Sequence, residues 1–165
     1  MSAEDHGPAY AVAATVTDPE LPVLTLAELG ILREVRDVDD AVVVSITPTY
    51  SGCPAMAQMR ADLTDALRAA GYATVEVRTV LHPPWTTDWI SETGRRKLAA
   101  AGIAPPGPAR TEAVVLPLAA PPSRVRCPRC GCPDTVEISR FSGTACKALR
   151  RCPNCVEPFE HLKEI

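Results

Sequence analysis

The alternation of hydrophobic and polar positions predicts both helices and strands in the first hundred residues. The clearest helix carries apolar side chains at steps of three and four residues, at Met56, Met59, Leu63, Leu67 and Ala70. This spacing is typical of an amphipathic helix, and Gly71 is placed to end it. Two runs rich in β-branched residues, 31–36 and 41–47, enclose an acidic turn and favour an antiparallel hairpin.

Three shorter segments extend this pattern. Residues 9–16 are rich in alanine and predict a helix that ends before the Asp18-Pro19 step. Residues 75–78 alternate like a half-buried strand, and Ser91 is placed to cap a helix that stops at Gly102. The order helix, strand, strand, helix, strand, helix indicates an α/β (α+β) fold, a small two-layer sandwich of about 100 residues.

Proline content divides the chain into two modules. Six of the seventeen prolines lie in residues 104–122, and such a run favours an extended linker over hydrogen-bonded structure. Residues 1–103 carry fourteen acids and eight bases, whereas residues 124–165 carry five acids and eight bases. We therefore predict a first domain at 1–103, a linker at 104–123 and a C-terminal module at 124–165.

Four cysteines in the C-terminal module have the spacing of a metal site. Cys127-Pro-Arg-Cys130 and Cys152-Pro-Asn-Cys155 are two Cys-x-x-Cys units separated by twenty-one residues. Two thiolates on each tight turn supply the four corners of a tetrahedron around one ion. We predict a structural Zn²⁺ in an all-cysteine zinc ribbon. Rubredoxin-type iron has the same ligands, and a redox-active pair is a weaker alternative because it needs only one unit.

Three further cysteines lie outside this set. Cys53 precedes Pro54, which is well placed as a first helical residue, so we expect Cys53 to cap the helix with a reactive thiol. One thiol cannot hold a metal alone, and the groups that could complete a site are Asp18, Glu20, His82 or the Cys53 of a second copy. Cys146 lies among basic residues and is a candidate additional thiol, whereas Cys132 is expected only to pack near the first unit.

Trp85 and Trp89 lie four residues apart behind two prolines. On a helical turn they would share one face. Two interpretations stay open, which are packing in the core and a rigid apolar ridge that serves as a partner surface.

The composition excludes several classes of protein. Twenty acids against seventeen bases give a net charge of −3, which offers no broad basic field for nucleic acid. The longest apolar stretches fall short of the roughly 18 residues that a membrane span needs, and the acidic start does not resemble a secretory signal. We therefore expect a cytoplasmic protein with reduced cysteines and no membrane partner.

The motifs of the first domain resemble those of the iron-sulfur assembly domain found in SufT and in eukaryotic cytosolic iron-sulfur targeting factors. They are Asp18-Pro-Glu-Leu-Pro22, Leu26-Ala-Glu-Leu-Gly30, Thr47-Pro-Thr-Tyr-Ser-Gly-Cys53-Pro54 and Pro83-Pro-Trp-Thr-Thr-Asp-Trp89. The C-terminal module, with Ser142-Gly-Thr-Ala-Cys146-Lys-Ala-Leu149 and Glu157-Pro-Phe159, is similar to the PaaD family, accessory subunits of phenylacetyl-CoA epoxidase systems. The two resemblances cover nearly the whole chain apart from the linker.

The resemblance implies a non-catalytic factor that assists insertion of iron or an iron-sulfur cluster during phenylacetate catabolism. Its partners would be the di-iron oxygenase or the iron-sulfur reductase subunit of the epoxidase, and a homodimer is an open alternative. The family's reactive cysteine corresponds to Cys53, its acidic loop to Asp18 and Glu20, its ribbon ligands to the four cysteines above, and a further motif position to Cys146.

Two rival hypotheses come from the residues themselves. The C-terminal module carries the basic side chains of a zinc-ribbon nucleic-acid binder, at Arg124, Arg126, Arg129, Arg140, Lys147, Arg150 and Arg151. The acidic first domain counts against this hypothesis because phosphate contacts dominate such affinities. An enzyme with Cys53 as nucleophile lacks an identifiable base in the sequence.

Overall fold

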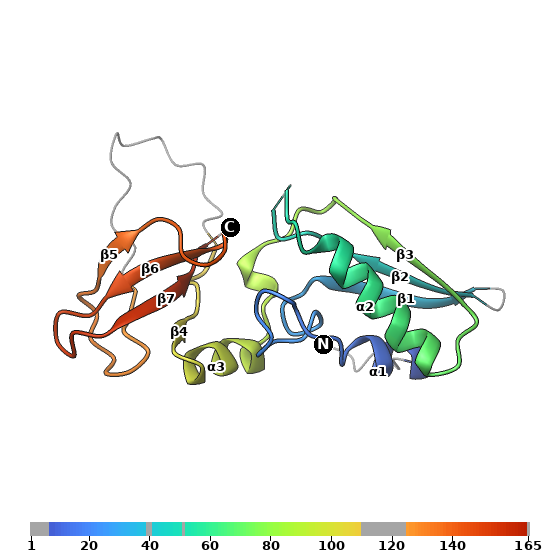
Figure 1. Cartoon of the computed structure of the whole chain (residues 1–165), viewed down its shortest axis with the longest axis horizontal. Coiled ribbons are helices and arrows are strands. Elements are labelled where there is room, and N and C mark those ends of the chain that lie inside the picture. Colours follow the sequence, from blue (N-terminus) through green and yellow to red (C-terminus); the bar gives the residue numbers. More distant parts are fainter. Residues whose placement is uncertain (1–6, 39–40, 51, 110–124, 165) are drawn as a thin grey trace. The chain divides into compact units, whose positions relative to one another are not determined.

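The computed structural model describes residues 7–38, 41–50, 52–109 and 125–164. These residues form two compact units (Figure 1). The first contains the described residues up to Trp85 together with Trp89–Gly94, and the second contains Thr86–Asp88 together with those from Arg95 onward. Among the described helices, none combines the length and the apolar character that crossing a lipid bilayer requires.

The first unit is built on a three-stranded sheet in the order β1-β2-β3 (Figure 1). Its strands are β1 (Leu32–Val38), β2 (Ala41–Ile46) and β3 (Thr74–Thr79). β1 and β2 pair antiparallel, which confirms the predicted hairpin, and β2 and β3 pair parallel. Because a parallel pair needs a crossover connection, the helix between β2 and β3 must return the chain across the sheet.

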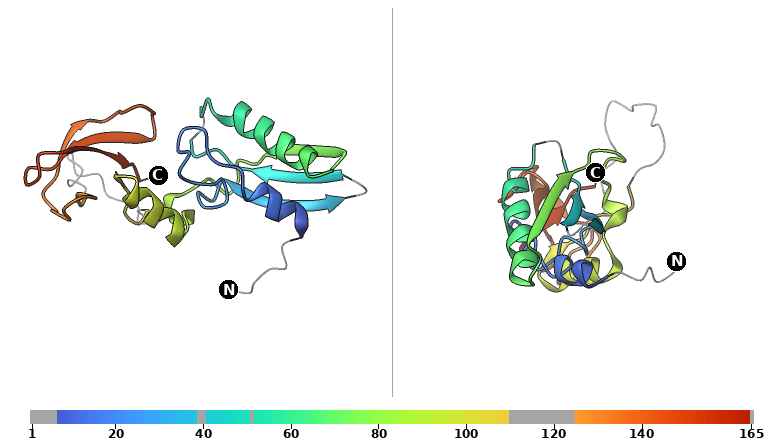
Figure 2. Two further views of the ribbon diagram at one scale, coloured as in Figure 1. Left: turned by 60° about the horizontal axis from the view of Figure 1, so that its bottom comes forward. Right: turned by 90° about the vertical axis from the view of Figure 1, so that its right-hand side faces the viewer.

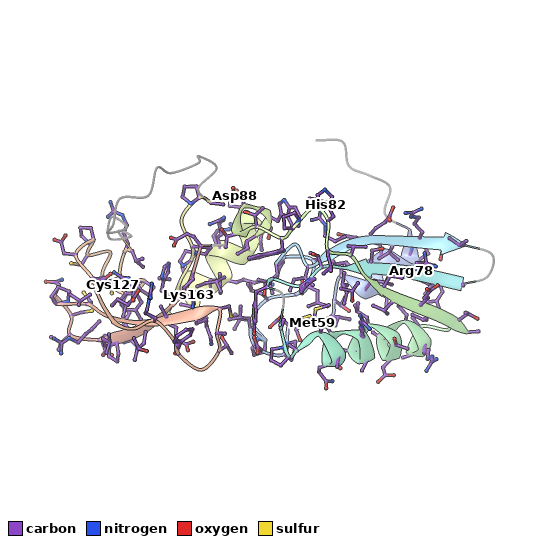
Figure 3. All side chains as sticks on the ribbon, turned by 90° about the horizontal axis from the view of Figure 1, so that it is seen from above. Met59, Arg78, His82, Asp88, Cys127 and Lys163 are labelled. Carbon is purple, nitrogen blue, oxygen red and sulfur yellow. The ribbon has the colours of Figure 1, made fainter. Side chains whose placement is uncertain are left out.

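That crossover is α2 (Met56–Ala69), which lies along one face of the sheet (Figures 1 and 2). Every second residue of β2 is buried, and so is one stripe of α2. The buried residues are Val42, Val44 and Ile46 on the strand and Met59, Leu63 and Leu67 on the helix; Met59 is labelled in Figure 3. Gly71, with φ 100°, follows the helix where the sequence predicted its end. The predicted two-layer α+β sandwich is confirmed.

The first helix is shorter than predicted. α1 (Pro8–Ala13) ends three residues before the expected Val16. The Val16 carbonyl instead accepts the Leu26 N–H at 2.9 Å, and Thr17 forms an isolated bridge with Thr25. These pairings draw the backbone into the loop between α1 and β1, where helical hydrogen bonds cannot continue.

The second unit contains a four-stranded sheet in the order β4-β7-β6-β5 (Figure 1). The strands are β4 (Ile103–Ala104), β5 (Val136–Ser139), β6 (Lys147–Arg151) and β7 (Pro158–Leu162). β6 pairs antiparallel with both β5 and β7, and β4 pairs parallel with β7. The short helical turn η1 (Thr87–Trp89) and the helix α3 (Glu92–Ala100) precede β4 in the chain. As predicted, Ser91 caps α3, because its Oγ accepts the Gly94 N–H at 3.0 Å.

The boundary between the units lies earlier than the predicted residue 103. Arg95 donates to the carbonyls of Thr87 and Pro106, at 2.7 and 2.6 Å, and Ala104 pairs with His161 of β7. These bonds place residues 95–109 in the second unit, and proline content alone could not reveal them. The rest of the predicted linker, residues 110–123, lies outside the described residues.

Candidate metal centre and the assembly-domain cysteine

The four cysteines of the two Cys-x-x-Cys units come together in the second unit. Their Sγ atoms all lie within 4.8 Å of one another. The Sγ atoms of Cys127 and Cys155 are 3.7 Å apart, and those of Cys130 and Cys152 are 3.5 Å apart. Sulfurs bonded at about 2.3 Å to a central Zn²⁺ with tetrahedral angles would be about 3.8 Å apart. The donor set and its spacing therefore fit one tetrahedral metal ion.

Equivalent backbone hydrogen bonds position the thiols in both turns. The Cys127 N–H donates to the Cys132 carbonyl at 2.9 Å, and the Cys152 N–H donates to the Glu157 carbonyl at 3.1 Å. Each bond closes a six-residue turn that carries both thiols of its unit. Small turns of this kind are the usual scaffold of all-cysteine sites.

One side of the site is sealed by the ribbon core. Cys127 and Cys152 are buried and belong to a hydrophobic cluster with Ala104, Val125 and Phe159. Cys130, by contrast, is exposed. Figure 3 shows Cys127 on the second unit. Because two ligands are part of the core, binding of a metal and folding of this core are coupled.

Hydrogen bonds and crowding shift the pKa values of Cys130 and Cys155 in opposite directions. The backbone N–H of Cys132 and the side-chain amide of Asn154 donate to Cys130 Sγ and, with a neighbouring thiol, lower the pKa of Cys130 to about 6. The backbone N–H of Glu157 would lower the pKa of Cys155, but burial and the neighbouring thiols raise it to about 12. Thiolates this close repel one another unless a cation lies among them, so the site favours a bound metal ion.

The second turn carries a strained valine. Gly131 and Val156 each follow the second cysteine of a unit, and both have positive φ, 73° and 63°. Glycine adopts this conformation without strain, whereas a β-branched residue does not. Val156 is 65% exposed and therefore gains little from burial.

We expect Val156→Gly to stabilise the metal-loaded ribbon by about 1 kcal/mol, because the relief of strain exceeds the added chain entropy. Urea unfolding of the zinc-loaded protein, followed by amide NMR signals of β6 and β7, measures the change. Gly131→Val is the matched reverse substitution and should destabilise the same strands. A Val156→Gly protein less stable than wild type would contradict the role of strain at this position.

The structure corrects the predicted role of Cys53 as a helix cap. α2 begins at Met56 with Ala55 at the N-cap position, and no side chain caps it. Cys53 lies in the preceding turn, where its carbonyl accepts the Met56 N–H at 3.4 Å and its N–H donates to the Tyr50 carbonyl at 3.3 Å. Pro54 is therefore part of this turn rather than the first helical residue. The Cys53 side chain is half-buried.

Asp18 and Glu20 lie in the loop between α1 and β1. Asp18 is 4% exposed, and its Oδ1 accepts the N–H groups of Glu20 and Leu21 at 2.8 and 2.7 Å. This carboxylate thus organises the loop backbone. Within the described ranges, the four ribbon cysteines form the only cluster of three or more side chains that could bind one metal ion. Cys53, Asp18 and Glu20 are not assembled into a three-ligand site, and their part in iron handling stays a prediction.

The structure supports packing in the core as the interpretation of Trp85. This side chain is 6% exposed, and its indole N–H donates to the Leu29 carbonyl at 2.9 Å. Trp89 is half-buried, with the Arg33 guanidinium 3.7 Å from its ring centroid. A β-carbon at Gly30 would lie 2.6 Å from the Trp89 β-carbon, so glycine is required for this close approach. Both indoles pack within the first unit, with Trp89 more exposed than Trp85, and their part in a partner surface stays a prediction.

Two cysteines outside the metal set have structural surroundings. Cys132 is half-buried and packs against the hydrophobic cluster of the ribbon, as predicted. Cys146 is 7% exposed, and its Sγ lies 3.1 Å from Thr144 Oγ1. Cys146 lies in the turn just before β6, and its side chain is buried. Its role as an additional thiol stays a prediction.

Glu160 organises the loop between β5 and β6, a role that the sequence patterns did not predict. Its carboxylate accepts the Lys147 ammonium at 2.7 Å and the Ser142 hydroxyl at 2.5 Å. Burial would raise the pKa of Glu160, but the donors from Lys147 and Ser142 outweigh it and lower the pKa below its ordinary value. No local pattern links these distant positions, so only the register of β6 against β7 reveals the contact.

Two family models match the chain. One, described as an iron-sulfur cluster assembly protein, matches residues 10–79, which include the end of α1, the three-stranded sheet and α2. The other, described as a PaaD zinc beta ribbon domain, matches residues 112–163, which include all four clustered cysteines. The two matches therefore correspond to the two units of the structure.

Individual relatives extend these matches. A DUF59 domain of unknown function from Bacillus anthracis is 30% identical, covers 55% of this chain and 87% of that chain, and has a TM-score of 0.50. The conserved hypothetical protein TM0487 from Thermotoga maritima is 29% identical over 59% of this chain and 98% of that chain, with a TM-score of 0.47. A protein of Escherichia coli (strain K12) that is named as a subunit of a 1,2-phenylacetyl-CoA epoxidase is 42% identical over 94% of this chain and 91% of its own length. The chain therefore belongs to the PaaD family, in which an iron-sulfur cluster assembly domain precedes a zinc β-ribbon.

Proposed function

We propose that this protein is a non-catalytic maturation factor of a phenylacetyl-CoA epoxidase system. It assists the insertion of iron or an iron-sulfur cluster into the oxygenase or the reductase subunit, and it works in the cytoplasm. The observation that carries the proposal is the union in one chain of an iron-sulfur assembly domain and a PaaD ribbon, together with the 42% identity to the Escherichia coli protein that bears the name of an epoxidase subunit.

The ribbon site supports a structural role for its metal, for which we propose Zn²⁺. Four thiols complete a tetrahedral coordination sphere and leave no position for a substrate or a water ligand. Two of the four ligands are also part of the hydrophobic core. A metal held in this way stabilises the fold and does not take part in transfer of iron to a client.

In this role, Cys53 is the residue that handles iron or a cluster. This thiol is half-buried in the turn that leads into α2, at the end of the loop that follows β2. A transient site must both take up and release its cargo. A thiol that is partly accessible on a loop can do this. Asp18 and Glu20 would assist from another loop of the same unit, or a second copy would contribute its Cys53.

The ion pairs of the ribbon weaken the nucleic-acid hypothesis. Three of the seven basic residues that motivated it are paired with carboxylates, at Arg129 with Glu157, Lys147 with Glu160 and Arg150 with Glu137. A base that already has a carboxylate partner contributes little counterion release on binding phosphate. The maturation factor is therefore the better supported function.

The proposal is tested by preparing the epoxidase subunits anaerobically in three ways: with the wild-type protein, with Cys53→Ala, and without this protein. We expect the client subunit to contain several-fold less iron or sulfide in the second and third preparations. Elemental iron analysis and acid-labile sulfide measure this, and Cys132→Ala serves as a control that removes a thiol outside the metal set. Equal metal content in all preparations, with activity restored by simply mixing in the protein, would contradict the proposal.

A further inference from the structure

Bonds to β5, β6 and β7 hold the loop between β5 and β6 in one conformation. Glu160 of β7 accepts the Ser142 hydroxyl and the Lys147 ammonium, and the Ser142 N–H donates to the Lys147 carbonyl at 3.0 Å. At the start of the loop, the Ser139 hydroxyl donates to the Phe141 carbonyl at 2.7 Å and accepts the Phe141 N–H at 3.2 Å. The backbone that carries Phe141 is therefore fixed before any partner binds.

This fixed loop presents apolar side chains to solvent. Phe141 is 63% exposed, and Ile138 and Val136 of β5 are 54% and 61% exposed. β5 is the last strand in the order β4-β7-β6-β5, so its outer edge has no neighbouring strand within the described part of the chain. Exposed apolar groups on a sheet edge are a typical feature of binding surfaces.

A basic group lies against the exposed ring, and a second one belongs to the residue that precedes it. The Lys163 ammonium lies 4.6 Å from the centroid of the Phe141 ring and donates to the Arg140 carbonyl at 3.1 Å; Lys163 is labelled in Figure 3. Arg140 is exposed. Among residues 125–164, as far as the structure describes them, no carboxylate pairs with Arg140 or Lys163, in contrast to Arg129, Lys147 and Arg150. Their charge is available to an acidic partner.

We propose that Ile138, Arg140, Phe141 and Lys163 form a docking surface, here called the Phe141 surface, for an acidic segment of a partner protein. An apolar side chain of that segment covers the Phe141 ring, while its carboxylates pair with Arg140 and Lys163. The proposal rests on the proposed function, because it takes the partner to be the oxygenase or the reductase subunit. Beyond that function, it names where the partner binds and which side chains recognise it.

A protein partner fits this surface better than a polyanion does. A nucleic acid or an anionic membrane is held by many basic groups acting together, and this surface offers only two of them, Arg140 and Lys163. A rigid aromatic side chain with charged neighbours is instead typical of a binding hot spot in a protein interface. The unpaired edge of β5 adds backbone groups that an extended segment can bond.

The test uses the full-length zinc-loaded protein and, as probes, the purified oxygenase and reductase subunits, with binding measured by titration calorimetry at low and high salt. We expect wild type to bind one of them and Phe141→Ala to weaken that binding about tenfold or more. Arg140→Glu should weaken it as well and flatten its salt dependence, since a favourable charge pair becomes repulsive. Val156→Ala is the matched control, because it truncates an equally exposed apolar side chain at the second metal turn, and it should bind as wild type does.

Zinc content and amide NMR spectra establish that each variant is folded. Unchanged affinity of both Phe141→Ala and Arg140→Glu would overturn the Phe141 surface and leave the maturation role intact, since that role is judged by the metal content of the client. Failure of the wild type to bind either subunit would also overturn it. The Phe141 surface would likewise be overturned if the protein bound anionic vesicles or duplex DNA instead of the subunits and Phe141→Ala abolished that binding.

Discussion

Replacing Cys152 by serine should remove the metal from the ribbon and unfold the second unit. Cys152 has no exposed surface and belongs both to the four-thiol site and to the core beside Phe159. Metal binding to a small all-cysteine module contributes on the order of 10 kcal/mol to folding, which is comparable to the whole stability of a small domain. Zinc analysis and two-dimensional NMR measure the outcome, in which the signals of β5, β6 and β7 collapse to unfolded positions.

The first unit should persist in the same Cys152→Ser protein. Its sheet, β1 to β3, and its helix α2 belong to a separate compact unit with its own core. Cys132→Ser is the matched control, because it alters a ribbon cysteine outside the four-ligand group and should leave zinc content unchanged. Full zinc content and a folded ribbon in Cys152→Ser would show that the four-thiol assignment is wrong.

Trp85→Ala should destabilise the first unit by about 3–5 kcal/mol, the usual cost of removing a buried aromatic side chain. The substitution leaves a cavity, and it also leaves the Leu29 carbonyl without the indole donor that it has at 2.9 Å. Hydrogen exchange of the α2 amides, for example those of Leu63 and Leu67, reports this loss as faster exchange. The ribbon amides provide an internal reference.

Two companion variants separate packing from hydrogen bonding and compare a buried ring with a half-buried one. Trp85→Phe keeps much of the buried volume but loses the indole donor, so we expect a smaller loss of about 1–3 kcal/mol. Trp89→Ala should cost less than Trp85→Ala because its ring is only half-buried. If Trp85→Ala left the exchange rates unchanged, the indole would not be part of the core.

Local patterns in the sequence predicted α2, the β1-β2 hairpin, the start of α3 and the two metal turns. The apolar steps from Met56 to Leu67 predicted α2 because a helix with one buried face must repeat with its own period. The acidic residues between two β-branched runs predicted the β1-β2 hairpin, and Ser91 predicted the start of α3. The two Cys-x-x-Cys units predicted the metal ligands because each turn is closed by bonds between near neighbours.

Contacts between distant residues account for what these patterns could not predict. Nothing within the run Pro83-Pro84-Trp85 shows that the indole bonds to Leu29, because the partner lies 56 positions away. Likewise, the pairing of Ala104 with His161 and the bonds of Glu160 to the loop at Phe141 arise only when β4, β6 and β7 are aligned. The residues alone predicted the helix periodicity, the hairpin and the four metal ligands, since these features depend on near neighbours in the chain. Which aromatic ring is buried and which is presented to solvent required the folded structure, because burial depends on what the rest of the chain places over each side chain.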